Sequence, residues 1–115
     1  MPFAVPAVSR LPSLKETSPA MHPAKVDRDK LHRFTDLPNI GPAMAGDFVA
    51  LGYTHPQQLA GLDPYALYQA LSKHTGTRQD PCVLDTFMSV TRFLAGEAPQ
   101  PWWAYTAERK RTYGL

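Results

Sequence analysis

The chain has few of the residues that build disulfides, metal centres and membrane spans. It has 115 residues and a single cysteine, Cys82, which excludes an internal disulfide. The histidines lack the pair spacing of metal ligands; they are His22, His32, His55 and His74. One cysteine cannot complete a structural zinc site. No apolar run approaches the ~18 residues that cross a bilayer. We therefore expect no metal, no cofactor and no membrane partner.

An excess of charge of one sign is also lacking in most of the chain. Residues 31–115 carry seven basic and seven acidic side chains, and the net charge of +2 comes from residues 1–30. A dedicated DNA-binding domain usually has a basic face, because phosphate neutralisation supplies most of its affinity. The neutral balance therefore argues against strong, independent DNA binding.

Residues 1–26 contain five prolines, separated by serine and threonine, with no sustained hydrophobic period. This composition is typical of a disordered arm. The alternative is a weak nucleic-acid or partner-binding arm that uses Arg10, Lys15 and Lys25. The apolar start is broken by prolines and precedes its first basic residue, the reverse of a signal peptide. We therefore expect a cytoplasmic protein.

Residues 27–110 show the apolar spacing of short amphipathic helices and predict one all-α domain. Capping residues, first-position prolines and terminal glycines mark the helix ends. Five to six helices are expected, in residues 27–36, 42–51, 56–60, 65–75, 81–95 and 102–109. The helix over 81–95 has the widest apolar arc and should be the most buried. Residues 111–115 form a basic tail that is expected to fray.

The sequence Leu37-Pro38-Asn39-Ile40-Gly41-Pro42 predicts a helix-hairpin-helix motif. Asn39 and Gly41 are residue types that tolerate positive φ, so the backbone can reverse quickly while Ile40 enters the core. Pro42 suits the first position of the next helix. The turn therefore presents backbone N–H groups at the positive end of that helix, where an anion can bind.

A nucleic-acid phosphate is the usual anion at such a turn. The predicted DNA phosphate-binding residues are Asn39, Ile40, Gly41, Ala43 and Met44. Hairpins that bind DNA commonly place a lysine or arginine just after the Gly-Pro, and this chain has Ala43 there. The contact is thus expected to be weak and uncharged, and a purely structural turn remains the alternative.

The motif repeats 22 residues later as Leu59-Ala60-Gly61-Leu62-Asp63-Pro64. The repeat predicts a core of two tandem helix-hairpin-helix units. In the second unit Asp63 stands at the position that Gly41 has in the first. Its carboxylate should cap its own helix and place negative charge where an anion would bind. The second hairpin is therefore expected to be structural.

Together with the first hairpin, several motifs in residues 31–110 resemble the small bacterial helix-hairpin-helix proteins of the pathogenicity-locus family. These motifs are Asp63-Pro64-Tyr65-Ala66-Leu67-Tyr68, Asp80-Pro81-Cys82-Val83-Leu84-Asp85, Phe87-Met88-Ser89-Val90 and Pro101-Trp102-Trp103. Members are often labelled mitomycin-resistance proteins. The resemblance implies a link to DNA damage and supplies no settled biochemical activity.

Two further features outside the hairpins carry candidate chemistry. Trp102, Trp103 and Tyr105 can stack bases or dock a protein partner, with at most one tryptophan deeply buried. Cys82 lies at a helix start, where the dipole lowers the pKa of an exposed thiol, and His74 is near in sequence. A lone cysteine is more often a small packed hydrophobe.

The leading hypothesis is a non-enzymatic module that binds DNA weakly and non-specifically through backbone phosphates. The resemblance adds a role in resistance to DNA damage by mitomycin. The alternative is a protein–protein adaptor in which the hairpins are only architecture and the Trp102 face docks a partner. A third reading, an enzyme with Cys82 as nucleophile, lacks a recognisable triad.

Overall fold

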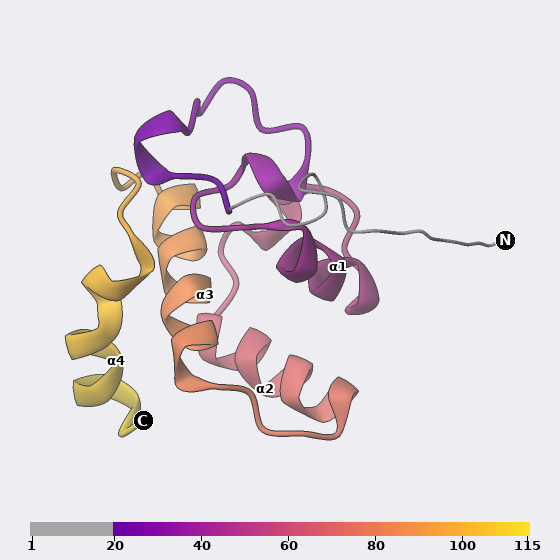
Figure 1. Ribbon diagram of the computed structural model, residues 1–115, viewed down its shortest axis with the longest axis vertical. Helices are drawn as coiled ribbons and strands as arrows, with labels where there is room; N and C mark the ends of the chain where they lie inside the picture. The colour runs from indigo at the N-terminus through magenta and orange to yellow at the C-terminus, as the bar shows by residue number, and fades with distance from the viewer. Residues whose placement is uncertain (1–19) are drawn as a thin grey trace, which may run out of the picture.

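The computed structural model describes residues 20–115 and is all-helical over that range (Figure 1). The first part of the predicted arm, with Arg10 and Lys15, lies outside the described residues. The α-helices are α1 (Pro42–Ala50), α2 (Pro64–Thr75), α3 (Pro81–Leu94) and α4 (Thr106–Tyr113). Short 3-10 helices are η2 (Pro23–Lys25), η3 (Phe34–Asp36), η4 (Pro56–Leu59) and η5 (Trp102–Tyr105). Over residues 20–115, no helix is both long and apolar enough for a membrane span.

The starts of α1, α2 and α3 follow the rules that predicted them. Each has a proline at its first position, where the missing N–H costs no hydrogen bond. The carboxylate of Asp63 accepts from the N–H of Tyr65 at 3.1 Å, as expected for a helix cap. Asp80 does the same for Cys82 at 2.9 Å. These caps satisfy N–H groups that a helix leaves unpaired.

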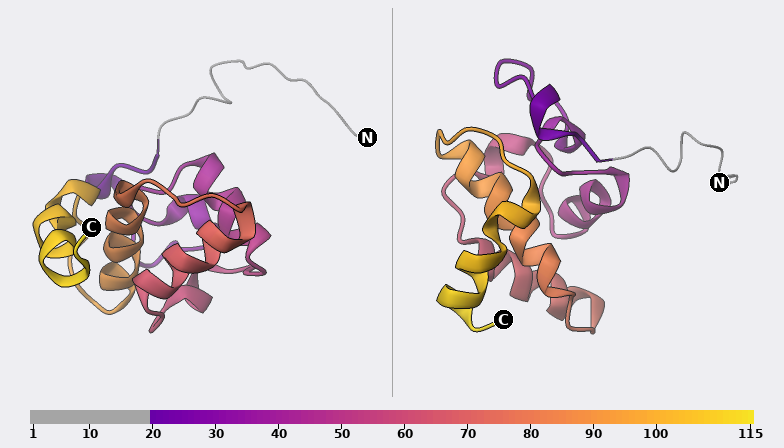
Figure 2. Two further views of the ribbon diagram at one scale, coloured as in Figure 1. Left: turned by 90° about the horizontal axis from the view of Figure 1, so that it is seen from below. Right: turned by 60° about the vertical axis from the view of Figure 1, so that its left-hand side comes forward.

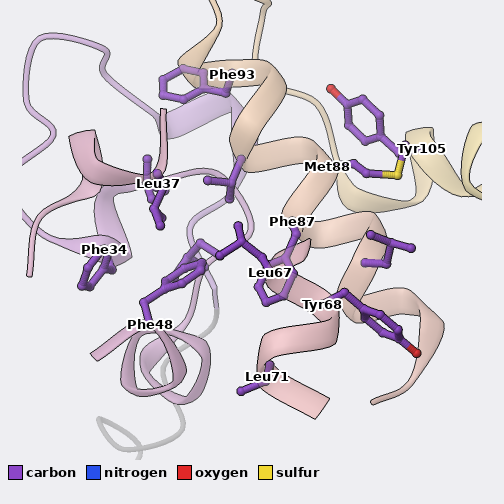
Figure 3. Close-up of a cluster of buried hydrophobic side chains, with 14 residues drawn as sticks. Phe34, Leu37, Phe48, Leu67, Tyr68, Leu71, Phe87, Met88, Phe93 and Tyr105 are labelled. Carbon is purple, nitrogen blue, oxygen red and sulfur yellow. The ribbon is translucent and has the colours of Figure 1, made fainter. Parts of the chain in front are cut away.

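Helix α3 is the centre of the fold. It lies between α4 on one side and α1 and α2 on the other (Figures 1 and 2), and it contacts α2, α4, η4 and η5. As predicted, it is the most buried helix. Phe48 of α1 fills the core between Phe34, at a ring distance of 5.2 Å, and Phe87 of α3, at 5.5 Å (Figure 3). Aromatic packing thus joins η3, α1 and α3.

The 22-residue sequence repeat is also a repeat of local structure. In each unit, the side chain at the end of the first turn accepts from two preceding backbone N–H groups. Asp36 accepts from His32 and Arg33, and Gln58 accepts from Thr54 and His55. Further along each unit come a fully buried leucine, a left-handed residue and a proline-initiated helix. These residues are Leu37 and Leu59, Asn39 (φ 66°) and Gly61 (φ 79°), and Pro42 and Pro64.

The prediction of a helix over residues 27–36 is wrong, because only η3 forms there. The carboxylate of Asp27 accepts from the N–H of Asp29 at 2.9 Å, a local turn that competes with a helix. Arg28 is engaged at long range. Its guanidinium donates to the carbonyls of Phe93 (2.6 Å) and Glu97 (2.8 Å) and lies 4.0 Å above the Phe93 ring. These contacts tie the segment to the carboxyl end of α3.

The two ends of the described chain also differ from expectation. Helix α4 continues to Tyr113 and ends at Gly114 in the left-handed conformation (φ 70°). Leu115 packs against the core, so residues 111–115 are not a frayed tail. At the other end, Met21 exchanges backbone hydrogen bonds with Asn39 and Ile40. The part of the expected arm that the structure describes therefore docks on the first hairpin.

A buried ion pair joins α3 to α4. Charged residues are usually exposed, but Asp85 is fully buried. One of its carboxylate oxygens accepts from Arg109 Nε and the other from Thr106 Oγ1, both at 2.7 Å. Arg109 is also buried and donates to the carbonyl of Leu115. This network positions α4 and the carboxyl terminus against α3.

Candidate nucleic-acid interface

In the predicted first hairpin, Asn39 is the residue with a left-handed backbone. Asn39 has φ 66°, in the left-handed region that asparagine tolerates better than most residues. Gly41 has φ −98° and ψ −179°, an extended conformation open to any residue, so its predicted need for positive φ is wrong. A Cβ at this position would lie 3.4 Å from Ala20 Cα, an ordinary van der Waals contact, so packing does not require glycine here either.

Three of the five predicted phosphate-binding residues have available N–H groups. The N–H of Asn39 donates to the Met21 carbonyl at 2.8 Å, and that of the fully buried Ile40 to Leu37 at 3.4 Å. Within residues 20–115, no acceptor is recorded for the N–H groups of Gly41, Ala43 and Met44. The anion site that the turn can offer is therefore the start of α1, without Asn39 and Ile40.

The Asn39 side chain connects the hairpin to two distant segments. Its amide nitrogen donates to Ser89 Oγ at 3.0 Å and to the carbonyl of Gln100 at 2.8 Å. Ser89 is fully buried on α3 and in turn donates to the Thr86 carbonyl at 2.6 Å. Gln100 lies two residues before Trp102. Asn39 thus sets the position of the hairpin relative to the tryptophans.

We predict that Asn39→Ala lowers the free energy of unfolding by about 2–3 kcal/mol. Alanine loses both amide hydrogen bonds and is strained at this φ, at a cost of ~1 kcal/mol for each effect. Asn39→Gly keeps the backbone conformation and should cost about 1 kcal/mol less. Urea denaturation of the two variants measures the difference. Equal stabilities would contradict a left-handed Asn39.

A broad groove of about 1330 Å³ runs beside this turn. Residues 20–25 form one wall, the Asn39–Ile40 turn and Pro42 form another, and α3 contributes Cys82 and Thr86. The rest of the lining comes from Arg33, Thr35, Pro99, Pro101 and the two tryptophans. The groove therefore has the predicted turn and the two tryptophans in one lining, whereas Gly41, Ala43 and Met44 are not among its lining residues.

The aromatic cluster departs from the predicted partner surface at Tyr105 alone. Trp102 and Trp103 are 36% and 63% exposed, so neither is deeply buried. Their rings are nearly perpendicular, at 85°, with centroids 5.5 Å apart. Tyr105 is buried, which removes it from the expected partner surface. Burial raises the pKa of its phenol, and its hydroxyl has no partner within the described residues.

The comparisons with known proteins place the chain in a family. The model of the family described as "Pathogenicity locus" matches residues 27–111. The chain belongs to this family. It is also similar to the mitomycin resistance protein McrB of Streptomyces lavendulae. The two are 46% identical over 77 residues, which cover 67% of this chain and 73% of that protein. A search of the solved structures gave no significant match.

The match to the pathogenicity-locus family includes most of the groove. The hairpin, α3 and both tryptophans lie inside residues 27–111, whereas the wall formed by residues 20–25 lies outside them. Sequence reasoning missed this wall and the role of Asn39. The one available signal was the choice of asparagine over glycine at a left-handed position, because an amide there can also donate hydrogen bonds.

The thiol of Cys82 lines the groove, but its surroundings do not activate it. Burial raises its pKa, and the neighbouring carboxylate of Asp80 acts in the same direction. The expected lowering by the helix start is therefore overcome. His74 instead lies near Asp47. Burial raises the pKa of Asp47, and the interaction with His74 offsets part of that rise. In residues 20–115 no three metal-ligating side chains cluster.

Proposed function

We propose that this chain is a non-enzymatic module that binds DNA weakly, without sequence preference, through backbone phosphates. In this proposal residues 34–50 form a helix-hairpin-helix motif whose first helix is reduced to the single turn η3. The second unit, residues 56–75, is its structural partner. The observation that carries the proposal is the set of available N–H groups on Gly41, Ala43 and Met44 at the start of α1.

The difference between the two units supports this assignment. In the second unit the carboxylate of Asp63 accepts from the Tyr65 N–H, so a negative charge already occupies the start of α2. In the first unit the corresponding residue is Gly41, which has no side chain. A phosphate at the start of α1 meets donors and the positive end of the helix dipole. At α2 it would meet a carboxylate.

The same geometry predicts a weak contact. Three neutral N–H groups can hydrogen-bond about one phosphate without neutralising its charge, and Ala43 stands where DNA-binding hairpins carry a cation. Affinity should therefore fall with salt at a shallow slope, near −1 to −2 in log K against log salt. Because the relative from Streptomyces lavendulae is named a mitomycin resistance protein, we also propose that this chain contributes to mitomycin resistance by binding DNA.

The exposed tryptophans favour a second candidate, a protein–protein adaptor. In that case the hairpins are architecture, and Trp102 and Trp103 dock a protein partner. Large exposed aromatic side chains are enriched at such interfaces. The available N–H groups at α1 then have no ligand, which is the point at which the two candidates differ.

We predict that Ala43→Lys tightens binding to duplex DNA of every sequence and steepens the salt slope by about one unit. The added ammonium group would lie beside the α1 N–H groups and neutralise one more phosphate. A salt series of binding titrations, with fluorescently labelled duplexes of different sequence, measures both quantities.

Ala66→Lys is the matched control. Ala66 is exposed in the first turn of α2, so this variant adds the same charge at the helix start of the second unit. It should change the slope much less, because Asp63 occupies that site. Equal effects of both lysines would indicate general electrostatic attraction and overturn the assignment to the first hairpin. Undetectable binding of Ala43→Lys at low salt would favour the adaptor.

A further inference from the structure

The groove has a charge of one sign in a domain that is otherwise neutral. Its basic lining residues are Lys25 and Arg33, with His22 beside them. None of the lining residues that the structure describes is acidic. Arg33 lies 3.6 Å from Asp36, but its side chain is 78% exposed and can extend toward a ligand. An elongated anion suits this groove better than a neutral or cationic ligand.

The tryptophans offer a flat apolar surface at one end of the same groove. Successive residues of a 3-10 helix point about 120° apart, so Trp102 and Trp103 face different directions. Both line the groove, and Trp103, at 63%, is the more exposed of the two and offers the larger surface for stacking. Nucleobases stack on such rings regardless of sequence.

The size of the groove favours a polymer over a small molecule. Its volume of about 1330 Å³ exceeds the ~300–1,000 Å³ of ordinary small-molecule sites. The Asn39 amide donates to the Gln100 carbonyl, so the turn at one end of the groove and the tryptophans at the other keep a fixed separation. A chain of alternating phosphates and flat bases fits both ends. Paired bases inside a duplex do not expose the faces that stacking needs.

We infer that the groove binds an unpaired DNA strand, with a base stacked on Trp103 and phosphates along Lys25 and Arg33 toward Pro42, the first residue of α1. This inference rests on the proposed function, because it identifies the form of DNA that the module recognises. The preferred ligand is then DNA with exposed bases, such as a single strand or a locally opened duplex. The hairpin alone would accept either form.

The two tryptophans make the inference directly measurable. They are the only tryptophans in the chain, so intrinsic tryptophan fluorescence reports on the groove. A thymidine oligonucleotide of about 12 nucleotides should quench it and bind more tightly than a duplex of the same length. Quenching by the duplex should be weak. Equal quenching and equal affinity for both ligands would overturn the inference.

Substitution of Trp103 gives the second test. Trp103→Ala should weaken oligothymidine binding about fivefold or more, since that is the lower end of the effect of losing one stacked base. Trp103→Phe keeps a ring and should retain most of the affinity. Val49→Ala is the matched control, because Val49 is 61% exposed and lies outside the groove lining. Labelled oligonucleotides make these titrations independent of fluorescence from tryptophan.

The outcomes separate the inference from the proposed function. If Ala43→Lys tightens duplex and single-strand binding alike while Trp103→Ala changes neither, the hairpin binds DNA and the stacking inference is wrong. If no variant binds either DNA at low salt, both are wrong and a protein is the occupant of the groove. Single-strand preference that disappears in Trp103→Ala, with duplex affinity unchanged, supports both. Thermal melting confirms that each variant is folded.

Discussion

Replacing Asp85 by alanine is expected to lower the free energy of unfolding by about 3–5 kcal/mol. The carboxylate is fully buried and accepts from Arg109 Nε and Thr106 Oγ1, both at 2.7 Å. Its removal leaves the buried guanidinium of Arg109 without its anion, which is the costly event. Domains of this size have total stabilities of only ~5–15 kcal/mol, so the variant should be near unfolding at room temperature.

Chemical denaturation followed by far-ultraviolet circular dichroism measures this loss. The double variant Asp85→Leu with Arg109→Met is the control, because it removes both charges and keeps similar volume. Replacing a whole buried pair with apolar residues is often neutral or stabilising. The double variant should therefore be more stable than Asp85→Ala. A cost below ~1 kcal/mol for Asp85→Ala would show that α4 is not docked on α3 in solution.

This ion pair marks one limit of prediction from the sequence. Asp85 and Arg109 are 24 residues apart and belong to different helices. Neither residue interrupts the apolar pattern in a way that indicates burial. Charged residues are usually exposed, and an individual buried pair follows from tertiary packing that no local spacing encodes. The sequence therefore carries no signal for the burial of Asp85.

Local chemistry explains why most helix starts and ends were predicted correctly. The starts of α1, α2 and α3 were predictable because Pro42, Pro64 and Pro81 each stand at a first helical position. The end of α2 was predictable because Gly76 takes the left-handed conformation, with φ 72°. In each case the signal and the feature it determines lie within a few residues of each other.

The candidate site was predictable in its parts and not in its assembly. The hairpin and the tryptophans each carried a local signal. Their joining in one groove depends on Asn39 reaching Gln100, 61 residues later, and on residues 20–25 docking beside the turn. The helix expected over residues 27–36 failed for the same reason, since Arg28 is committed to the carbonyls of Phe93 and Glu97. Tertiary contacts there override local propensity.

The second large effect is expected at the hairpin itself. Ile40→Asp should lower the free energy of unfolding by about 4 kcal/mol or more. The variant loses the ~1.5–3 kcal/mol of burying an isoleucine side chain, and it places an unpaired carboxyl group in an apolar core. Ile40 is fully buried between the left-handed Asn39 and the start of α1, so no small rearrangement brings the new group to water.

The equivalent position of the second unit supplies the control for this prediction. Leu62 follows the left-handed Gly61 as Ile40 follows Asn39, but Leu62 is only partly buried. Leu62→Asp should therefore cost clearly less than Ile40→Asp, because its carboxylate can remain hydrated. Ile40→Val, at about 0.5–1.5 kcal/mol, gives the cost of a small cavity without the charge. Equal, small losses for both aspartate variants would contradict the buried hairpin on which the phosphate site and the groove depend.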